Sequence, residues 1–145
     1  MKELSFDAVV VGGGAAGMAA ALELAGRGLS CAILEREAEL GGILMQCIHN
    51  GFGLIEFDEE LSGPEFAGRF EDRVGASPIR PFLGTTVIGM ETDGDRKVLT
   101  CVSAEQGVLR IQARAVVLAM GCRERNRGNI RIPGARPAGV FTAGL

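Results

Sequence analysis

Three glycines near the start of the chain have the spacing of a nucleotide-binding turn. Gly12, Gly14 and Gly17 follow an apolar run in the pattern G-x-G-x-x-G. Gly12 permits a tight turn out of a strand, Gly14 lets a pyrophosphate approach bare backbone, and Gly17 lets the next helix pack closely. Ala15 and Ala16 would offer free N–H groups at the positive end of that helix, where an anion binds.

The elements around this turn are those that a dinucleotide-binding unit requires. Residues 6–11 are predicted to form a buried parallel strand, and residues 15–24 a helix that Gly28 ends. A second strand is predicted at 29–34, and Glu35 follows it, roughly 20 residues beyond the glycines. A carboxylate at this point accepts hydrogen bonds from both ribose hydroxyls of an adenosine and repels a 2′-phosphate. The sequence therefore favours FAD or NAD over NADP.

Composition excludes several classes of function. The chain has 145 residues, of which 47% are hydrophobic, and this suits one domain with a buried core. Its 15 basic and 18 acidic residues give a net charge of −3, which argues against a nucleic-acid or anionic-membrane partner. The N-terminus is too polar for a signal peptide, and no apolar stretch approaches the ~18 residues of a membrane span. We therefore expect a cytoplasmic protein.

The cysteines do not form a recognisable metal or redox motif. Neither C-x-x-C nor metal-ligand spacing occurs among the four of them, so no metal site is predicted. Cys31 and Cys101 fall within predicted strands and are interpreted as small core residues.

Segment 43–53 contains the side chains with the most varied chemistry in the chain, those of Cys47, His49 and Asn50. It is either a loop that lines a pocket beside the cofactor or a partly buried helix and turn in which Cys47 is inert. We favour pocket lining without catalysis, because an i,i+2 spacing does not supply the geometry of a nucleophilic Cys–His pair. The preceding pair Gly41-Gly42 either permits close backbone approach to a bulky group or ends a helix.

The rest of the chain contains one clear helix and several strands. Ser62 and Glu65 predict a helix start with a capping box. The periodicity then becomes two-fold, and three short antiparallel strands are predicted to form a meander at 86–90, 98–102 and 108–113. Another buried parallel strand is predicted at 115–121.

A run of arginines follows this last strand, namely Arg123, Arg125, Arg127, Arg131 and Arg136. It forms either a phosphate-binding or interdomain surface or an exposed linker, and both interpretations stay open.

Together these features resemble a known family. The glycine turn, Glu35, Gly41-Gly42, the meander and Ala119-Met120-Gly121 are similar to the FAD domain of pyridine nucleotide-disulfide-reductase-like flavoproteins of the glutathione and thioredoxin reductase type. Segments 41–53 and 121–125 resemble one branch, the NAD(P)/FAD-dependent oxidoreductases found beside glycerol-3-phosphate dehydrogenases and related to the FAD subunits of hydrogen cyanide synthase. The resemblance implies an α/β, Rossmann-like FAD/NAD(P)-binding fold with a parallel central sheet and a three-stranded antiparallel meander as a crossover.

The resemblance also implies which positions contact each part of FAD. The pyrophosphate would be held by Gly12, Gly14, Ala15, Ala16 and Gly17. The adenosine end would meet Glu35, Arg36 and the backbone of Val87. The ribityl chain would lie near Gly42, and the cofactor would be closed over by Ala119 and Gly121.

Two departures from the family limit the expected function. Cys47 stands alone, so disulfide reduction is not expected. Neither a second glycine-rich motif for NAD(P)H nor a C-terminal Gly-Asp motif is present. Residues 1–145 are therefore expected to be a partial FAD-binding domain, with 122–145 beginning a linker toward an NAD(P)-binding domain. Whether a partner subunit or a homodimer completes it stays open.

The leading hypothesis is the FAD-binding portion of an oxidoreductase that passes hydride or electrons between NAD(P)H or a small organic substrate and FAD. This piece alone is expected to be inactive, and no catalytic residue is assigned. A plain NAD-dependent Rossmann dehydrogenase is one alternative, against which the meander and the second glycine pair argue. A non-catalytic or RNA-modifying FAD-binding protein is another alternative. The net negative charge of the chain argues against RNA binding.

Overall fold

The structure is a computed structural model that describes residues 2–122, 125, 127–131, 133–135 and 138. Its strands are β1 (Lys2–Val11), β2 (Cys31–Leu34), β3 (Asn50–Phe52), β4 (Leu61–Ser62), β5 (Arg80–Phe82), β6 (Thr85–Asp93), β7 (Arg96–Ser103) and β8 (Gly107–Leu118). Its helices are α1 (Ala15–Gly26), the 3-10 helix η1 (Gly42–Gln46), α2 (Leu54–Phe57), α3 (Gly63–Gly75) and α4 (Arg127–Ile130).

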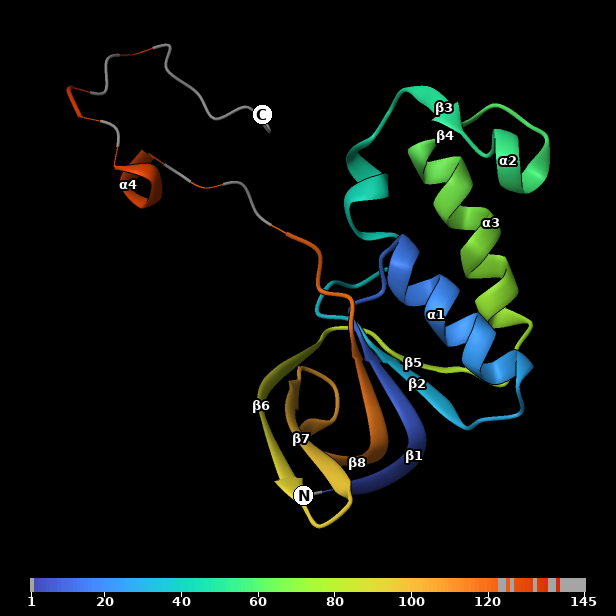
Figure 1. Cartoon of the computed structure of the whole chain (residues 1–145), viewed down its shortest axis with the longest axis vertical. Coiled ribbons are helices and arrows are strands. Elements are labelled where there is room, and N and C mark those ends of the chain that lie inside the picture. The colour runs from blue at the N-terminus through green and yellow to red at the C-terminus, as the bar shows by residue number, and fades with distance from the viewer. Residues whose placement is uncertain (1, 123–124, 126, 132, 136–137, 139–145) are drawn as a thin grey trace.

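A six-stranded sheet in the order β5-β2-β1-β8-β7-β6 organises the chain, and a small second sheet pairs β3 with β4 (Figure 1). β5, β2, β1 and β8 run parallel, whereas β6, β7 and β8 are joined as an antiparallel meander. This confirms the predicted fold class. None of the helices among the described residues combines the length and apolar character needed to cross a bilayer.

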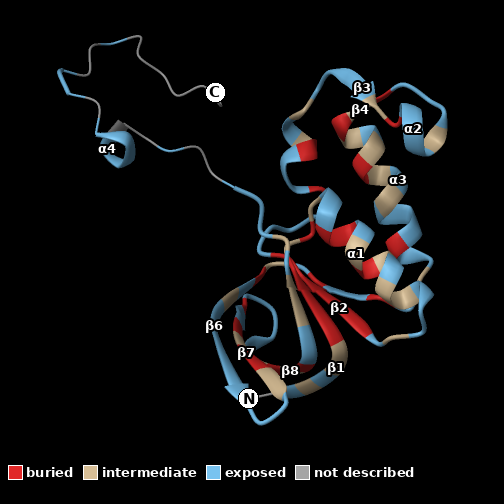
Figure 2. Ribbon diagram, in the orientation of Figure 1, coloured by how far each residue is buried: buried red, intermediate tan, exposed pale blue. Residues whose placement is uncertain are grey.

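β1 is one of the two central strands, and its second half, residues 8–11, is buried on both faces (Figure 2). Its last residue, Val11, is paired with Leu34 on one side and with Leu118 on the other. Val9 packs into the core beneath the meander, whereas Val10 packs into the core beneath α1 and α3. The predicted strand is therefore confirmed, but it begins at Lys2 because the meander extends the partner strand β8 in that direction.

An irregularity interrupts β1 at Asp7. The N–H groups of Asp7 and Ala8 both donate to the carbonyl oxygen of Ser30, at 3.0 and 3.1 Å. Phe6 and Val9 consequently face the same core although they lie three positions apart, which regular two-residue alternation does not allow. The Asp7 carboxylate accepts hydrogen bonds from the Ser30 hydroxyl (2.6 Å) and N–H (3.0 Å), and these bonds hold the pKa of Asp7 below its usual value.

One long strand replaces two of the predicted ones. The expected strands at 108–113 and 115–121 are a single strand, β8, which ends at Leu118. It pairs antiparallel with β7 as far as Ala113 and parallel with β1 as far as Leu118. Arg114, which separates the two predicted strands, lies opposite the irregularity in β1, and its guanidinium is 3.5 Å from Asp7 Oδ1.

The helix α3 begins as predicted. The Ser62 hydroxyl accepts from the Glu65 N–H, and the Glu65 carboxylate accepts from the Ser62 N–H at 2.8 Å, which completes a capping box. Further along α3, the Arg73 guanidinium lies 4.7 Å from the centre of the Phe57 ring and pairs with Glu56 at 2.6 Å. These contacts hold α2 against α3.

Candidate functional site

The glycine turn lies where the carboxyl ends of β1, β2 and β8 meet. Gly12 has φ +106°, and its N–H donates to the carbonyl of Leu34 at 2.9 Å. A Cβ atom at Gly12 would collide with the carbonyl oxygen of Ala119, and one at Gly17 would collide with the carbonyl oxygen of Gly12. Both positions therefore need glycine for close backbone packing, as the sequence predicted.

At Gly14, by contrast, the fold itself does not require glycine. A Cβ atom at Gly14 would meet nothing within 4 Å, and its φ of −73° is open to any residue. The following residues Ala15 and Ala16 are exposed, and the first turn of α1 contains no acidic side chain. The first N–H groups of a helix have no partner within the helix, so this end of α1 presents unobstructed donors to an anion.

The glycine pair at 41–42 lies against this turn. The Gly41 N–H donates to the carbonyl of Gly13 at 2.9 Å, and a Cβ atom at Gly42 would lie 3.2 Å from the Cα of Gly14. Residues 36–40 form no helix, and Gly41 is the N-cap of η1. The helix-end interpretation is therefore wrong. The glycine pair approaches the backbone of Gly13 and Gly14, and its approach to a bulky group stays a prediction.

Glu35 is buried at the end of β2 and is 7% exposed. Its Oε2 accepts a 2.6 Å hydrogen bond from the Gly13 N–H, and its Oε1 accepts a 2.9 Å bond from the Glu37 N–H. Gly13 was not among the predicted site residues. A side chain at Gly13 would run into Leu40 and the Glu35 carboxylate, and its place in the middle of three consecutive glycines is the signal that could have identified it.

Two other residues that are predicted to contact FAD, Ala119 and Val87, lie near Gly12 and Glu35. Ala119 donates its N–H to the carbonyl of Val11 at 2.8 Å, which places its own carbonyl against Gly12. Val87 is half-buried on β6, and the first residue of that strand, Thr85, donates its N–H to the Glu35 carbonyl at 2.8 Å. Glu35 and Val87, both predicted to contact the adenosine, therefore lie near each other.

Arg36 and Gly121 lie farther out. The exposed Arg36 places its Nε 3.0 Å from Glu37 Oε1, and Gly121 is exposed with φ +68°. Of the predicted arginine run, Arg123, Arg136 and the side chain of Arg127 lie outside the described residues, as does most of the predicted linker 122–145.

Cys47 and His49 lie on the connection between η1 and β3. The half-buried Cys47 thiol donates to the carbonyl of Ile43 at 3.3 Å, and the Cys47 carbonyl accepts from the Gly63 N–H at 2.9 Å. The exposed His49 places its Nδ1 3.0 Å from the carbonyl of Asn50. Each side chain thus has a local backbone contact, and their role as pocket-lining residues stays a prediction.

Parallel strands whose carboxyl ends surround a glycine turn, with an acidic residue ending the second strand, define a Rossmann-like dinucleotide-binding domain. Residues 6–143 match the pyridine nucleotide-disulphide oxidoreductase family, and the chain belongs to it. It corresponds to the part of these proteins for which FAD binding is expected.

Relatives and solved structures agree with this assignment. The chain is 31% identical to hydrogen cyanide synthase subunit HcnB of Pseudomonas protegens, with 97% of this chain and 29% of the relative covered. It is 25% identical to the crystal structure of T. acidophilum thioredoxin reductase, with a TM-score of 0.72 over 86% of this chain and 38% of that chain. L-proline dehydrogenase from P. horikoshii is 28% identical, with a TM-score of 0.68 over 83% of this chain and 23% of that chain. The chain thus spans under a third of the curated relative.

The residues present fit the dinucleotide end of FAD. Bare backbone at Gly14 faces open space, the start of α1 is free of acidic side chains, and the glycines at 41–42 keep side chains away from the same spot. Gly12, Gly14, Ala15, Ala16 and Gly17 would hold the pyrophosphate, and Glu35 would hold the ribose.

Proposed function

We propose that this chain provides the pyrophosphate- and adenosine-binding part of an enzyme that transfers hydride or electrons between NAD(P)H or a small organic substrate and FAD. The observation that carries the proposal is the convergence of the backbones of Gly12, Gly14 and Gly42 beside the buried Glu35 carboxylate. When bound, FAD would supply the redox chemistry, and the protein would position it.

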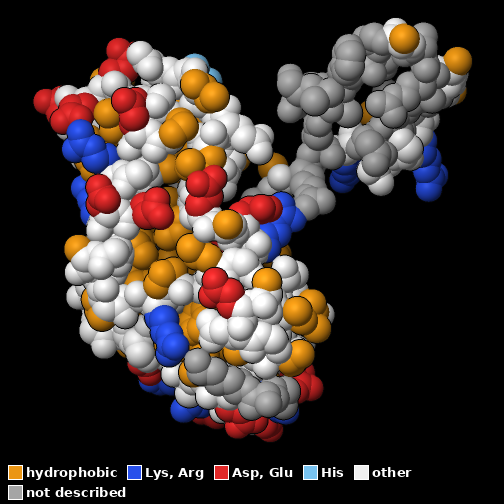
Figure 3. Space-filling model, turned by 180° about the vertical axis from the view of Figure 1, so that it is seen from behind, with side chains coloured by type: hydrophobic (Ala, Val, Ile, Leu, Met, Phe, Trp, Pro, Cys, Tyr) orange, Lys and Arg blue, Asp and Glu red, His pale blue; other side chains and the backbone are white. Residues whose placement is uncertain are grey.

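The start of α1 and the Glu35 carboxylate have separate parts in this proposal. The first N–H groups of α1 would bind the pyrophosphate charge. The second acceptor positions of the Glu35 carboxylate oxygens, whose first positions are taken by Gly13 and Glu37, would receive the ribose hydroxyls. The same carboxylate would repel the 2′-phosphate of NADP. Seen from behind, hydrophobic side chains gather in the middle of the molecule, and such a surface suits a flat ring system (Figure 3).

The substrate is proposed to be a small organic molecule. Cys31 and Cys101 are buried in the core, so neither thiol is accessible to a disulfide substrate. L-proline dehydrogenase of P. horikoshii, which is named for a small organic substrate, shares 28% identity with this chain. The electron acceptor or donor would be NAD(P)H or a partner protein.

The test is a titration with FAD, followed by the flavin absorbance and by fluorescence quenching, for the 145-residue chain and for a polypeptide extended beyond it. Binding of FAD by either, with NADP not competing, supports the proposal. Binding of NAD without any FAD binding would overturn it in favour of a plain dehydrogenase. Because the chain lacks Trp and Tyr, the protein also contributes little absorbance or fluorescence in the near ultraviolet.

A further inference from the structure

The backbone of Glu35 is held by the connection between β5 and β6. The Glu35 N–H donates to the Phe82 carbonyl at 3.0 Å, and the Glu35 carbonyl accepts from the Thr85 N–H at 2.8 Å. Two positions further along, the Glu37 carbonyl accepts from the Gly84 N–H at 2.8 Å. Three backbone hydrogen bonds therefore join this connection to the chain that leaves β2.

The side chain of Glu35 is held from the same segment. Its Oε2 accepts from the Gly13 N–H at 2.6 Å, and its Oε1 accepts from the Glu37 N–H at 2.9 Å. Glu37 thus links the two sets of bonds, because its N–H binds the carboxylate and its carbonyl binds Gly84. The direction in which the carboxylate faces a ribose therefore depends on where the connection between β5 and β6 holds residues 35–37.

A buried hydroxyl group fixes the conformation of this connection. Thr85 is 1% exposed, and its Oγ1 donates to the Leu83 carbonyl at 2.9 Å. Gly84, between them, has φ +55°, a left-handed conformation that glycine adopts at little cost. The hydroxyl bond spans this turn and so helps to keep the Thr85 N–H directed at the Glu35 carbonyl.

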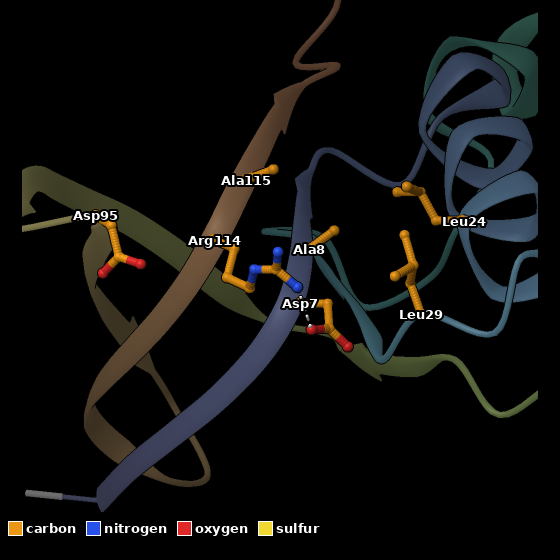
Figure 4. A pocket seen from close by; sticks show the side chains of 7 residues that line it. All are labelled: Asp7, Ala8, Leu24, Leu29, Asp95, Arg114 and Ala115. Atoms are coloured by element: carbon orange, nitrogen blue, oxygen red, sulfur yellow. Dashed lines mark hydrogen bonds and ion pairs between the residues drawn. The ribbon is translucent and has the colours of Figure 1, made fainter.

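The opposite end of the sheet is packed less tightly. A hollow of about 460 Å³ lies there, between the end of α1 and strands β1 and β8, and Leu24 and Leu29 line its helix side (Figure 4). At the carboxyl end of β2, by contrast, Glu35 and Thr85 are both buried and hydrogen-bonded. The closely bonded region is therefore the one where the nucleotide would bind.

We propose that Thr85 is a positioning residue for nucleotide recognition, because its hydroxyl holds the connection between β5 and β6 in the conformation that directs the Glu35 carboxylate at the ribose hydroxyls. The inference rests on the proposed assignment of Glu35 to the ribose of FAD, and it adds the residue on which the selectivity of that contact depends. Thr85 acts through Glu35 and does not itself touch the nucleotide.

The test compares the affinity for FAD with that for the FAD analogue that carries 2′-deoxyadenosine, measured by quenching of flavin fluorescence in the polypeptide that binds FAD. The parent should bind FAD at least about 10-fold more tightly than the analogue, which lacks one hydrogen bond to a charged group. Thr85→Val should reduce this ratio to about threefold or less. Thr85→Ser keeps the hydroxyl and should keep the parental ratio. A general loss of stability would not change a ratio of two affinities.

Thr100→Val is the matched control. It makes the same chemical change at a half-buried position of β7, where the neighbours across the sheet are Gly89 and Arg110, and it should leave the ratio unchanged. An unchanged ratio in Thr85→Val would overturn the proposal, and so would an equal loss in Thr85→Ser. A parent that binds both dinucleotides equally would refute the ribose assignment of Glu35 and this inference with it. A parent that binds neither would overturn the proposed function as well.

A double-mutant cycle gives a second readout. Glu35→Gln alone should weaken FAD binding, and Thr85→Val should add little in that background, because both changes act on one contact. Additive effects of the two substitutions on FAD affinity would contradict the proposal even if FAD binding is confirmed.

Discussion

The Glu35 carboxylate accepts a 2.6 Å hydrogen bond from the backbone N–H of Gly13. A side chain at the end of β2 therefore fixes the peptide in the middle of the turn that follows β1. The sequence pattern assigns Glu35 to the ribose of the cofactor, and the structure adds that the same carboxylate shapes the turn on which the pyrophosphate would lie. Preorganisation of this kind reduces the cost of ordering a site when a ligand binds.

Replacement of Glu35 should therefore affect stability as well as cofactor affinity. Glu35→Ala leaves the Gly13 and Glu37 N–H groups without their acceptor, and we expect a loss of about 1–3 kcal/mol in the free energy of unfolding together with weaker FAD binding. Urea denaturation and FAD titration measure the two effects. Glu37→Gln is the control, because its side chain is exposed and pairs only with Arg36 among its described contacts; it should change stability by less than about 0.5 kcal/mol. Unchanged stability and affinity in Glu35→Ala would refute both roles.

The glycines of the turn should separate into two classes when each is replaced by alanine. Gly17→Ala forces a Cβ atom onto the Gly12 carbonyl and should destabilise the fold by about 1–3 kcal/mol. Gly14→Ala meets open space, so it should leave the urea midpoint unchanged and still weaken FAD binding, and Gly14→Val should abolish binding.

Gly26→Ala is the control for both glycine variants, since its Cβ position is also open but lies at the far end of α1. It should leave stability and FAD affinity intact. Full FAD affinity in Gly14→Val would remove the pyrophosphate assignment.

The four cysteines should differ in their reactivity toward alkylating agents. Burial raises the pKa of Cys31 and of Cys101 to about 11, so both thiols stay protonated and inaccessible at pH 8. Iodoacetamide with mass spectrometry should label the exposed Cys122 in the folded chain, and Cys31 and Cys101 only after unfolding.

The same buried thiols should contribute to the pH dependence of stability. In the unfolded chain they ionise near their ordinary pKa of about 9, whereas in the folded chain they hold their protons to about pH 11. The unfolded state then binds fewer protons, so stability should fall as the pH rises from about 9 to 11. Cys101→Ala should reduce this loss, and an identical slope in the variant and the parent chain would count against the assignment.

Asp7 should contribute to stability only where it is ionised. Hydrogen bonds from Ser30 and the Arg114 guanidinium lower its pKa, so its contribution is present above its ordinary pKa of 3.8 and is lost as the pH falls through the lowered value. Asp7→Asn should therefore lower the urea midpoint at pH 6 and have a smaller effect once the pH has fallen through the lowered pKa. A difference that stays constant with pH would show that the carboxylate charge has no part in holding the irregularity of β1.

The local elements of the fold could be predicted because each has a local physical cause. The capping box of Ser62 and Glu65 fixes the start of α3, Gly28 with φ +78° ends α1, and the apolar residues before Gly12 form a strand buried on both faces. These features depend on neighbours within a few positions, so the sequence contains them directly.

The features that could not be predicted depend on contacts distant in the sequence. Two strands are predicted on either side of Arg114, whereas β8 runs through Arg114, whose guanidinium contacts Asp7, 107 positions earlier. The role of Gly13 depends on the side chain of Glu35, and the approach of Gly42 to Gly14 depends on how segment 36–41 folds back. Chemistry-bearing residue types could be identified from the sequence, but their mutual contacts could not.

The pairing of β1 with β8 has a consequence for how the chain is made. β1 emerges from the ribosome before β8, one of its two neighbouring strands, which is more than a hundred positions downstream, so its apolar edge stays open until β8 has been made. Nascent chains that have not yet reached Leu118 would therefore be exposed to aggregation and would be natural clients for chaperones. The order of synthesis also means that the glycine turn acquires the Ala119 backbone that packs on it only after β8 has been made.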